Sequence, residues 1–387
     1  MASFALTLEP TRKVYRIAVG FLFFLQGVTF ASWASRIPSI QQQLQLSETA
    51  LGLALLALPA GSLLSLPFTG WLIQRFGSRR VALHALIFYA LFLLCIGFAS
   101  SLPHLITALV LFGMAGNVSN IAINTQAVGV EARYGRSIMA SFHGLWSLAG
   151  FAAAGLGTLM IGEQIPPHRH FLGVTLFLFT GALLTYRYLI REEETTEGSS
   201  FLVRPDKSLL VLGVIAFCCM ICEGAMFDWS GIYFQKVVQA EPQWVGAGYA
   251  AFMCTMAGGR FIADRMAHRF GIRRTILFSG ALIATGLATA VLFPTLGSAL
   301  AGFLLVGFGV SSVVPLVYSE AGKSEHLSPS HALSAVSSIG FLGFLAGPPL
   351  IGLLAGAFSL QVSFSVIALM GVMVGVIAAR GLQRNRS

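Results

Sequence analysis

The chain has 387 residues, of which 56% are hydrophobic and 10% are charged, and its formal net charge is +9. Soluble proteins carry about 25% charged residues, so this composition excludes a large soluble domain and predicts a membrane protein. The positive charge does not indicate a nucleic-acid-binding protein, because the basic residues lie mainly between apolar runs, where they orient a membrane protein.

Apolar runs of membrane-spanning length recur along the whole chain. A helix needs about 20 mostly apolar residues to cross a hydrocarbon core, and the run from Val362 to Ala379 carries no charge at all. We predict twelve transmembrane helices, at 16–38, 49–73, 80–100, 104–130, 137–161, 169–190, 208–232, 244–264, 274–293, 298–319, 330–356 and 360–380.

The basic residues sort by side when this helix count is applied. With the N-terminus inside, 20 of the 24 Lys and Arg residues fall on the inner side, and the outer loops hold only Arg36, Arg169 and Lys236. A wrong count would scramble this asymmetry. We therefore expect a multi-pass protein of the inner (plasma) membrane with both termini in the cytoplasm.

The chain also repeats itself. The run Arg75–Arg80 (RFGSRR) returns as Arg269–Arg274 (RFGIRR), each time between the second and third helix of a set of six. The hydrophilic segment 191–207 lies between the two sets and is predicted to be a cytoplasmic linker joining halves 1–190 and 208–387. Repeated six-helix halves are the mark of alternating-access transporters.

This motif carries a family resemblance. The pattern Gly70-x-Leu72-x-x-Arg75-x-Gly77-x-Arg79-Arg80, with its second copy, resembles the major facilitator superfamily over essentially the whole chain. The resemblance implies an all-α fold of two pseudo-symmetric six-helix halves. It also implies gating roles for the motif arginines Arg75, Arg79, Arg80, Arg273 and Arg274.

The sequence departs from the family pattern where an aspartate is usual: the first copy has Gln74, and the second has His268 with Asp264 one turn earlier. This puts the family's gating salt bridge in question in the first half.

A finer resemblance points to a sugar-porter-like bacterial branch related to fucose permease. It rests on the segments 31–38 (ASWASRIP), 223–229 (EGAMFDW) and 343–349 (GFLAGPP). That branch implies a small polar solute, such as a sugar or a related metabolite.

Glu223 is the sharpest chemical feature, since it falls near the middle of the helix at 208–232. A charge at that depth costs about 2.5–3.5 kcal/mol, so such residues usually face a cavity. Burial favours the neutral carboxyl group, which suits reversible protonation. A neutral acid hydrogen-bonded to a neighbouring helix is the alternative. Asp228 and His143 are further candidates for proton coupling.

Asp228 follows Glu223 by five residues, so the two acids point about 140° apart on a helix. Asp228 is therefore expected to serve a different neighbour, and Arg36, at similar depth, is the candidate partner and a candidate gating residue. Arg260 and Asp264 are spaced to pair with each other at an inner gate. Because Arg260 lies further inward than Glu223, a direct pair between these two is not expected.

Polar side chains follow stripes on several helices. Asn117, Asn120 and Asn124 share one face of the helix at 104–130. Hydrogen bonding between helices is the alternative to cavity lining. The family places the first, fourth, seventh and tenth helices around the cavity, which favours lining. The same reasoning adds Glu223 and, on the other helices, the substrate-binding candidates Gln26, Trp33, Ser311 and Tyr318. Trp33 also fits an interfacial role.

No phosphate-binding loop, nucleophile–base motif or dinucleotide fingerprint occurs, so the sequence predicts neither an enzyme nor a cofactor nor a metal site. We predict a secondary transporter, proton-coupled, for a small polar solute. Its predicted partners are the lipid bilayer, the solute and protons, without nucleic acid, and the expected state is a monomer. A proton-coupled exporter of drugs or metabolites, and a sensor with a transporter fold, are the alternatives.

Overall fold

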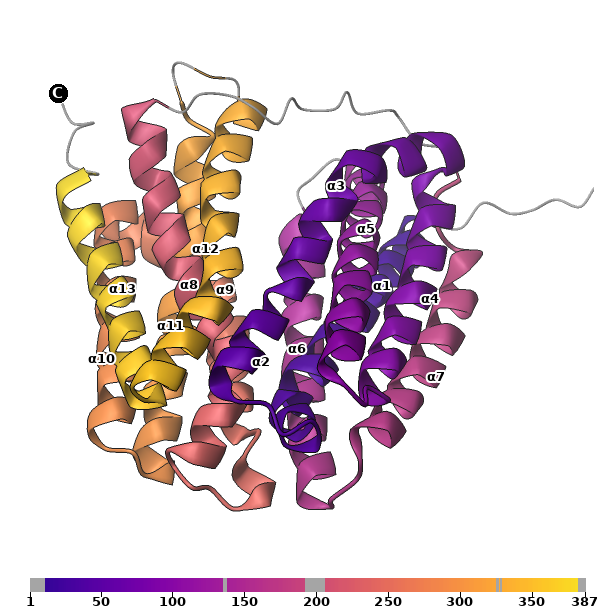
Figure 1. The fold of residues 1–387 in the computed structure, drawn as a ribbon. Coiled ribbons are helices and arrows are strands. Elements are labelled where there is room, and N and C mark those ends of the chain that lie inside the picture. The colour runs from indigo at the N-terminus through magenta and orange to yellow at the C-terminus, as the bar shows by residue number, and fades with distance from the viewer. Residues whose placement is uncertain (1–10, 135–137, 192–205, 325–326, 328, 382–387) are drawn as a thin grey trace, which may run out of the picture.

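The computed structural model describes residues 11–134, 138–191, 206–324, 327 and 329–381. These residues form thirteen α-helices and one short 3₁₀ helix, with no β-strand among them (Figure 1). The first group of helices comprises α1 (Arg12–Gln43), α2 (Glu48–Leu55), α3 (Ala57–Phe76), α4 (Ser78–Gly97), α5 (Leu102–Tyr134), α6 (Met139–Gly162) and α7 (Pro167–Tyr186). The second comprises α8 (Lys207–Lys236), η1 (Pro242–Trp244), α9 (Ala247–Phe270), α10 (Ile272–Leu292), α11 (Leu296–Ala321), α12 (Pro329–Ala357) and α13 (Leu360–Gly381).

The all-α fold class is confirmed. Since α2 and α3 are separated only by Leu56, the described helices make twelve passes, compatible with the predicted count. Ten of these passes are long and apolar enough to cross a membrane; α7 and α9 are not among them. Several helices extend beyond their predicted ends, as α1 does to Gln43, because polar residues can continue a helix past the apolar core.

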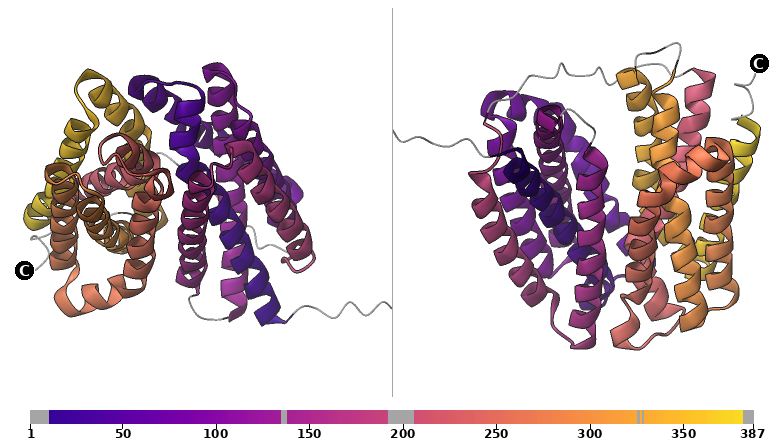
Figure 2. Two further views of the ribbon diagram at one scale, coloured as in Figure 1. Left: turned by 90° about the horizontal axis from the view of Figure 1, so that it is seen from below. Right: turned by 180° about the vertical axis from the view of Figure 1, so that it is seen from behind.

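The helices form two bundles side by side, one from α1–α7 and one from α8–α13 (Figures 1 and 2). Residues 192–205, which include most of the predicted linker, lie outside the described residues. The positions of the two half boundaries therefore stay a prediction.

The repeated motif has the same backbone conformation and makes equivalent contacts in both bundles. Gly77 and Gly271 end α3 and α9 with φ angles of 79° and 84°, which favour glycine. Arg79 donates from Nε to the carbonyl oxygen of Tyr186 at 2.9 Å, and Arg273 donates from Nη2 to that of Ala379 at 2.8 Å. In each half the arginine joins the start of the third pass to the end of the sixth.

The two bundles meet near one end. There Lys236 Nζ lies 2.5 Å from Glu48 Oε1, and the Thr49 hydroxyl donates to the Gly352 carbonyl oxygen at 3.3 Å. Gly52 lies against the backbone of Gly352, with room for no side chain. The bundles diverge toward the opposite end, where α3 meets α4 (Figure 1). This arrangement leaves a cavity between them.

Candidate functional site

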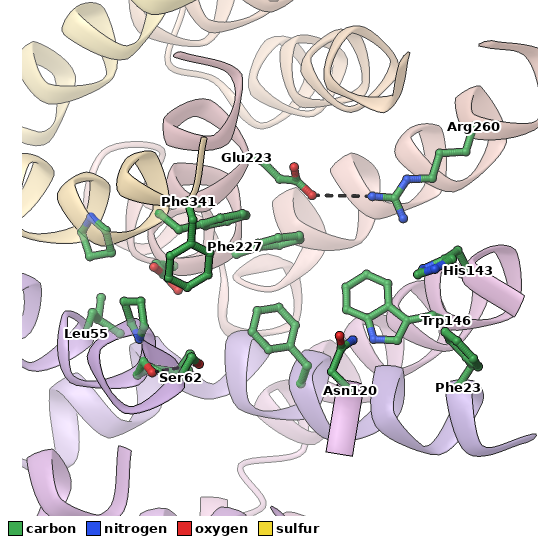
Figure 3. Close-up of a pocket in the computed structure, with 17 residues that line it drawn as sticks. Phe23, Leu55, Ser62, Asn120, His143, Trp146, Glu223, Phe227, Arg260 and Phe341 are labelled. Atoms are coloured by element: carbon green, nitrogen blue, oxygen red, sulfur yellow. Dashed lines mark hydrogen bonds and ion pairs between the residues drawn. The ribbon is translucent and has the colours of Figure 1, made fainter. Parts of the chain in front are cut away.

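A cavity of about 350 Å³ lies between the two bundles. Helices α1, α2, α3, α5 and α6 supply one wall, and α8, α9 and α12 supply the other (Figure 3). Its lining is mainly aromatic and apolar, with a few polar groups: Phe23, Phe30, Leu55, Leu58, Pro59, Ser62, Asn120, His143, Trp146, Glu223, Gly224, Phe227, Asp228, Arg260, Phe341, Phe344 and Pro348. Such a mixture is typical of a small-molecule site.

An ion pair lies in the wall of this cavity that the second bundle supplies. Arg260 Nη2 of α9 lies 3.7 Å from Glu223 Oε1 of α8, and Arg260 Nη1 donates to the Ser147 hydroxyl of α6 at 2.8 Å (Figure 3). The expectation that Arg260 and Glu223 do not pair is wrong, because the long arginine side chain makes up their difference in depth. Arg260 thus joins a carboxylate of one bundle to a hydroxyl of the other.

His143 lies beside this pair. It lines the cavity, and its ring meets the edge of Phe23 at a centroid distance of 5.1 Å. Its own carbonyl oxygen accepts from the Ser147 hydroxyl that Arg260 also contacts. The candidate proton-coupling residues Glu223 and His143 therefore share one cavity, on opposite bundles.

Asp228 also lines the cavity, but not as predicted. The proposed pair with Arg36 is wrong, since Arg36 is 2% exposed and donates from Nη2 to the Ile165 carbonyl oxygen at 2.6 Å. The turn after α6 brings that carbonyl group to the C-terminal part of α1. Within the described residues, Asp228 has neither an ion pair nor a hydrogen bond.

The asparagine stripe is divided between lining and packing. Asn120 faces the main cavity and a smaller one of about 190 Å³ next to it, which Asn117 and Gln26 also line. Asn117 donates to the Ser65 hydroxyl at 2.7 Å, and Gln26 donates to the Gly116 carbonyl oxygen at 3.2 Å. Asn124 lines neither cavity and donates to the Asn120 carbonyl oxygen at 2.8 Å.

The remaining substrate-binding candidates lie outside the lining of both cavities. Trp33 is fully buried, so in this conformation its ring cannot stack on a solute. Ser311 donates to the Phe308 carbonyl oxygen at 2.6 Å, and Tyr318 is half-buried.

The motif arginines lie apart from the cavity. Arg75 and Arg80 are exposed at the diverging end, whereas Arg79 and Arg273 make the contacts within each bundle described above. Arg274 is exposed at the start of α10. The side chain of Asp264 lies outside the described residues, as does its predicted pair with Arg260. The gating roles of these residues remain predictions.

Sequence reasoning missed the aromatic walls. Phe30, Trp146, Phe227, Phe341 and Phe344 line the cavity, yet such residues are ordinary anywhere in a membrane helix. One signal was available, because Phe227 and Phe344 lie inside the segments that carry the finer family resemblance.

The family model of the Major Facilitator Superfamily matches residues 19–326. The chain belongs to this superfamily. It is 33% identical to the membrane protein MosC of Rhizobium meliloti, with 98% of this chain and 93% of that protein covered. It is 31% identical to an uncharacterized transporter of the superfamily from Yersinia pestis, with 95% and 96% covered.

Solved structures share the fold of this superfamily member. The nucleoside transporter NupG superposes with a TM-score of 0.79 at 12% identity, covering 95% of this chain and all of that one. An inward-facing bacterial homologue of the lysosomal transporter Spinster superposes with a TM-score of 0.75 at 13% identity, covering 98% and 99%. Family, relatives and fold assign the chain to membrane transport and point away from catalysis.

Proposed function

We propose that this protein is a secondary active transporter that moves a small polar solute, sugar-like or a related metabolite, by alternating access and in symport with protons. In this proposal it lies in the inner (plasma) membrane with both termini in the cytoplasm, so the diverging end faces inward. The observation that carries the proposal is the ion pair of Glu223 with Arg260, set in a cavity between the two bundles.

The pair supplies a means of coupling. A deprotonated Glu223 attracts Arg260, which is also held by Ser147 of the other bundle. Protonation of Glu223 removes that attraction and frees Arg260 to move relative to the carboxyl group. Water admitted on one side favours ionisation, and occlusion favours the neutral acid. A proton exchanged at Glu223 is thereby linked to the arrangement of the two bundles.

The test uses proteoliposomes and a panel of radiolabelled sugars and related metabolites. For a neutral solute moved with one proton, a medium one pH unit more acidic than the vesicle interior drives about tenfold accumulation by the wild type. Glu223→Gln keeps the shape of the side chain but cannot ionise, so we expect it to lose accumulation and to retain counterflow of the same solute.

The control variant is Glu163→Gln, which removes a carboxylate at the end of α6, remote from the cavity. It should accumulate solute as the wild type does. Accumulation by Glu223→Gln at the wild-type level would exclude Glu223 as the coupling site.

A further inference from the structure

The cavity carries an uncompensated negative charge. With His143 counted as neutral, the charged side chains among its lining residues are Glu223, Asp228 and Arg260. Glu223 and Arg260 form an ion pair, so their formal charges cancel, and Asp228 is left with a charge of −1 and no partner in the described part of the chain. Asp228 is half-buried, and nothing in the described part of the chain offsets the cost of partly burying its carboxylate. A ligand that supplied the missing positive charge would remove that cost.

Three aromatic rings line the same cavity as Asp228. Phe227, its neighbour in sequence, lies with its ring centroid 5.2 Å from that of Phe30, edge to face, and 6.3 Å from that of Phe344, nearly parallel. All three line the cavity. Ring faces attract cations, and clusters of such rings hold ammonium groups. The rings come from both bundles, so a cation bound here would contact each of them.

A negatively charged ligand fits this cavity less well. Arg260 is the cationic lining residue among the described side chains, and its two terminal nitrogens are already engaged by Glu223 and Ser147. A carboxylate ligand would have to displace Glu223 from Arg260 and would then lie in the same cavity as two carboxylates. A neutral polyol would leave Asp228 unpaired.

We propose that the solute carries an ammonium group, which lies against the carboxylate of Asp228 within the rings of Phe30, Phe227 and Phe344. The polar remainder of the solute then faces Ser62 and Asn120 on the other wall. This inference rests on the proposed function, since it assigns the substrate class to the same cavity. It assigns Asp228 a role in binding and leaves proton coupling to Glu223.

The test measures binding rather than transport, so it can fail or succeed independently of proton coupling. Purified full-length protein in detergent at pH 7.5 is titrated with three probes of equal size: benzylammonium, benzyl alcohol and benzoate. The dissociation constant of each is measured by calorimetry. We expect benzylammonium to bind about tenfold more tightly than either other probe.

The variants decide which residue is responsible. Asp228→Asn should weaken benzylammonium binding about tenfold and leave benzyl alcohol unaffected, whereas Asp228→Glu and the remote control Glu163→Gln should retain the preference for the cation. Circular dichroism and gel filtration establish that each variant is folded. Tighter binding of benzoate, equal binding of all three probes, or unchanged benzylammonium binding by folded Asp228→Asn would each overturn the proposal.

Discussion

Neighbouring polar residues on one helix play different parts in this protein. Asn117 and Asn120 are one turn apart on α5, and both were predicted to line the cavity. Asn117 lines the smaller cavity and is bonded to Ser65 of α3, whereas Asn120 faces both cavities. The helical spacing places the two amides on one stripe, but only the position of the neighbouring α3 decides which of them is used for packing.

A pair of substitutions separates these two roles. Asn120→Leu removes an amide from the cavity wall and should lower kcat/KM for the transported solute at least about tenfold, equivalent to about 1.4 kcal/mol. Asn117→Leu removes a helix–helix hydrogen bond and should lower the free energy of unfolding by about 0.6 kcal/mol. Uptake assays and chemical denaturation of the purified variants measure the two effects. Normal uptake by Asn120→Leu would place the solute elsewhere.

For the charged residues, the sequence predicted positions along the helices but not the partners of the side chains. The depth of Glu223 in its helix predicts a functional role without a structure. Its partner was not predictable, because depth along a helix does not account for the reach of an arginine side chain. The supposed partnership of Arg36 with Asp228 failed for a related reason: equal depth says nothing about which backbone carbonyl group lies nearer.

At the scale of helices, apolar length predicted a count of twelve that is compatible with the described helices, and the predicted bounds lie within about six residues of the observed ones. The pass that contains α2 and α3 was predicted as one helix. Its interruption at Leu56 follows from Pro59, which has no N–H group to donate to the carbonyl oxygen of Leu55. The repeated glycine–arginine motif was also visible in the sequence. The contacts of Arg79 with Tyr186 and of Arg273 with Ala379 required the fold, because each joins segments more than a hundred residues apart.

The contact of α2 with α12 can be tested directly by substitution. A Cβ atom on Gly52 would lie 2.7 Å from the Pro348 carbonyl oxygen, so Gly52→Ala forces the two helices apart. In a variant without native cysteines, Leu55→Cys is buried behind this contact and lines the cavity. We expect Gly52→Ala to raise several-fold the rate at which Leu55→Cys reacts with an impermeant thiol reagent added at the end of the molecule that carries Glu48.

Gly173→Ala serves as the matched control, since a Cβ atom at Gly173 of α7 meets nothing within 4 Å. Its reaction rate should equal that of the parent protein. Equal rates in Gly52→Ala and Gly173→Ala would mean that the contact between α2 and α12 does not close the cavity.

At the scale of the whole molecule, alternating access requires that the two bundles rock about their shared cavity. The ion pair of Lys236 with Glu48 is partly exposed, with side-chain exposures of 39% and 26%, so it contributes about 0–1 kcal/mol to the closed end. A contact that weak can hold one arrangement and still permit the other. Lys236→Gln should therefore raise the population of molecules that are open at that end a few-fold.

The most direct test of alternating access measures distances between the bundles at both ends. Spin labels at Gln42 and Leu292, both exposed, report the end where the bundles meet, and labels at Gln74 and His268 report the diverging end. Electron–electron double resonance on the full-length protein in lipid nanodiscs should give two distances for each pair. Lys236→Gln should enrich the longer distance of the first pair and the shorter distance of the second together. A single unchanged distance at both ends, in the wild type and in Lys236→Gln, would contradict transport by alternating access.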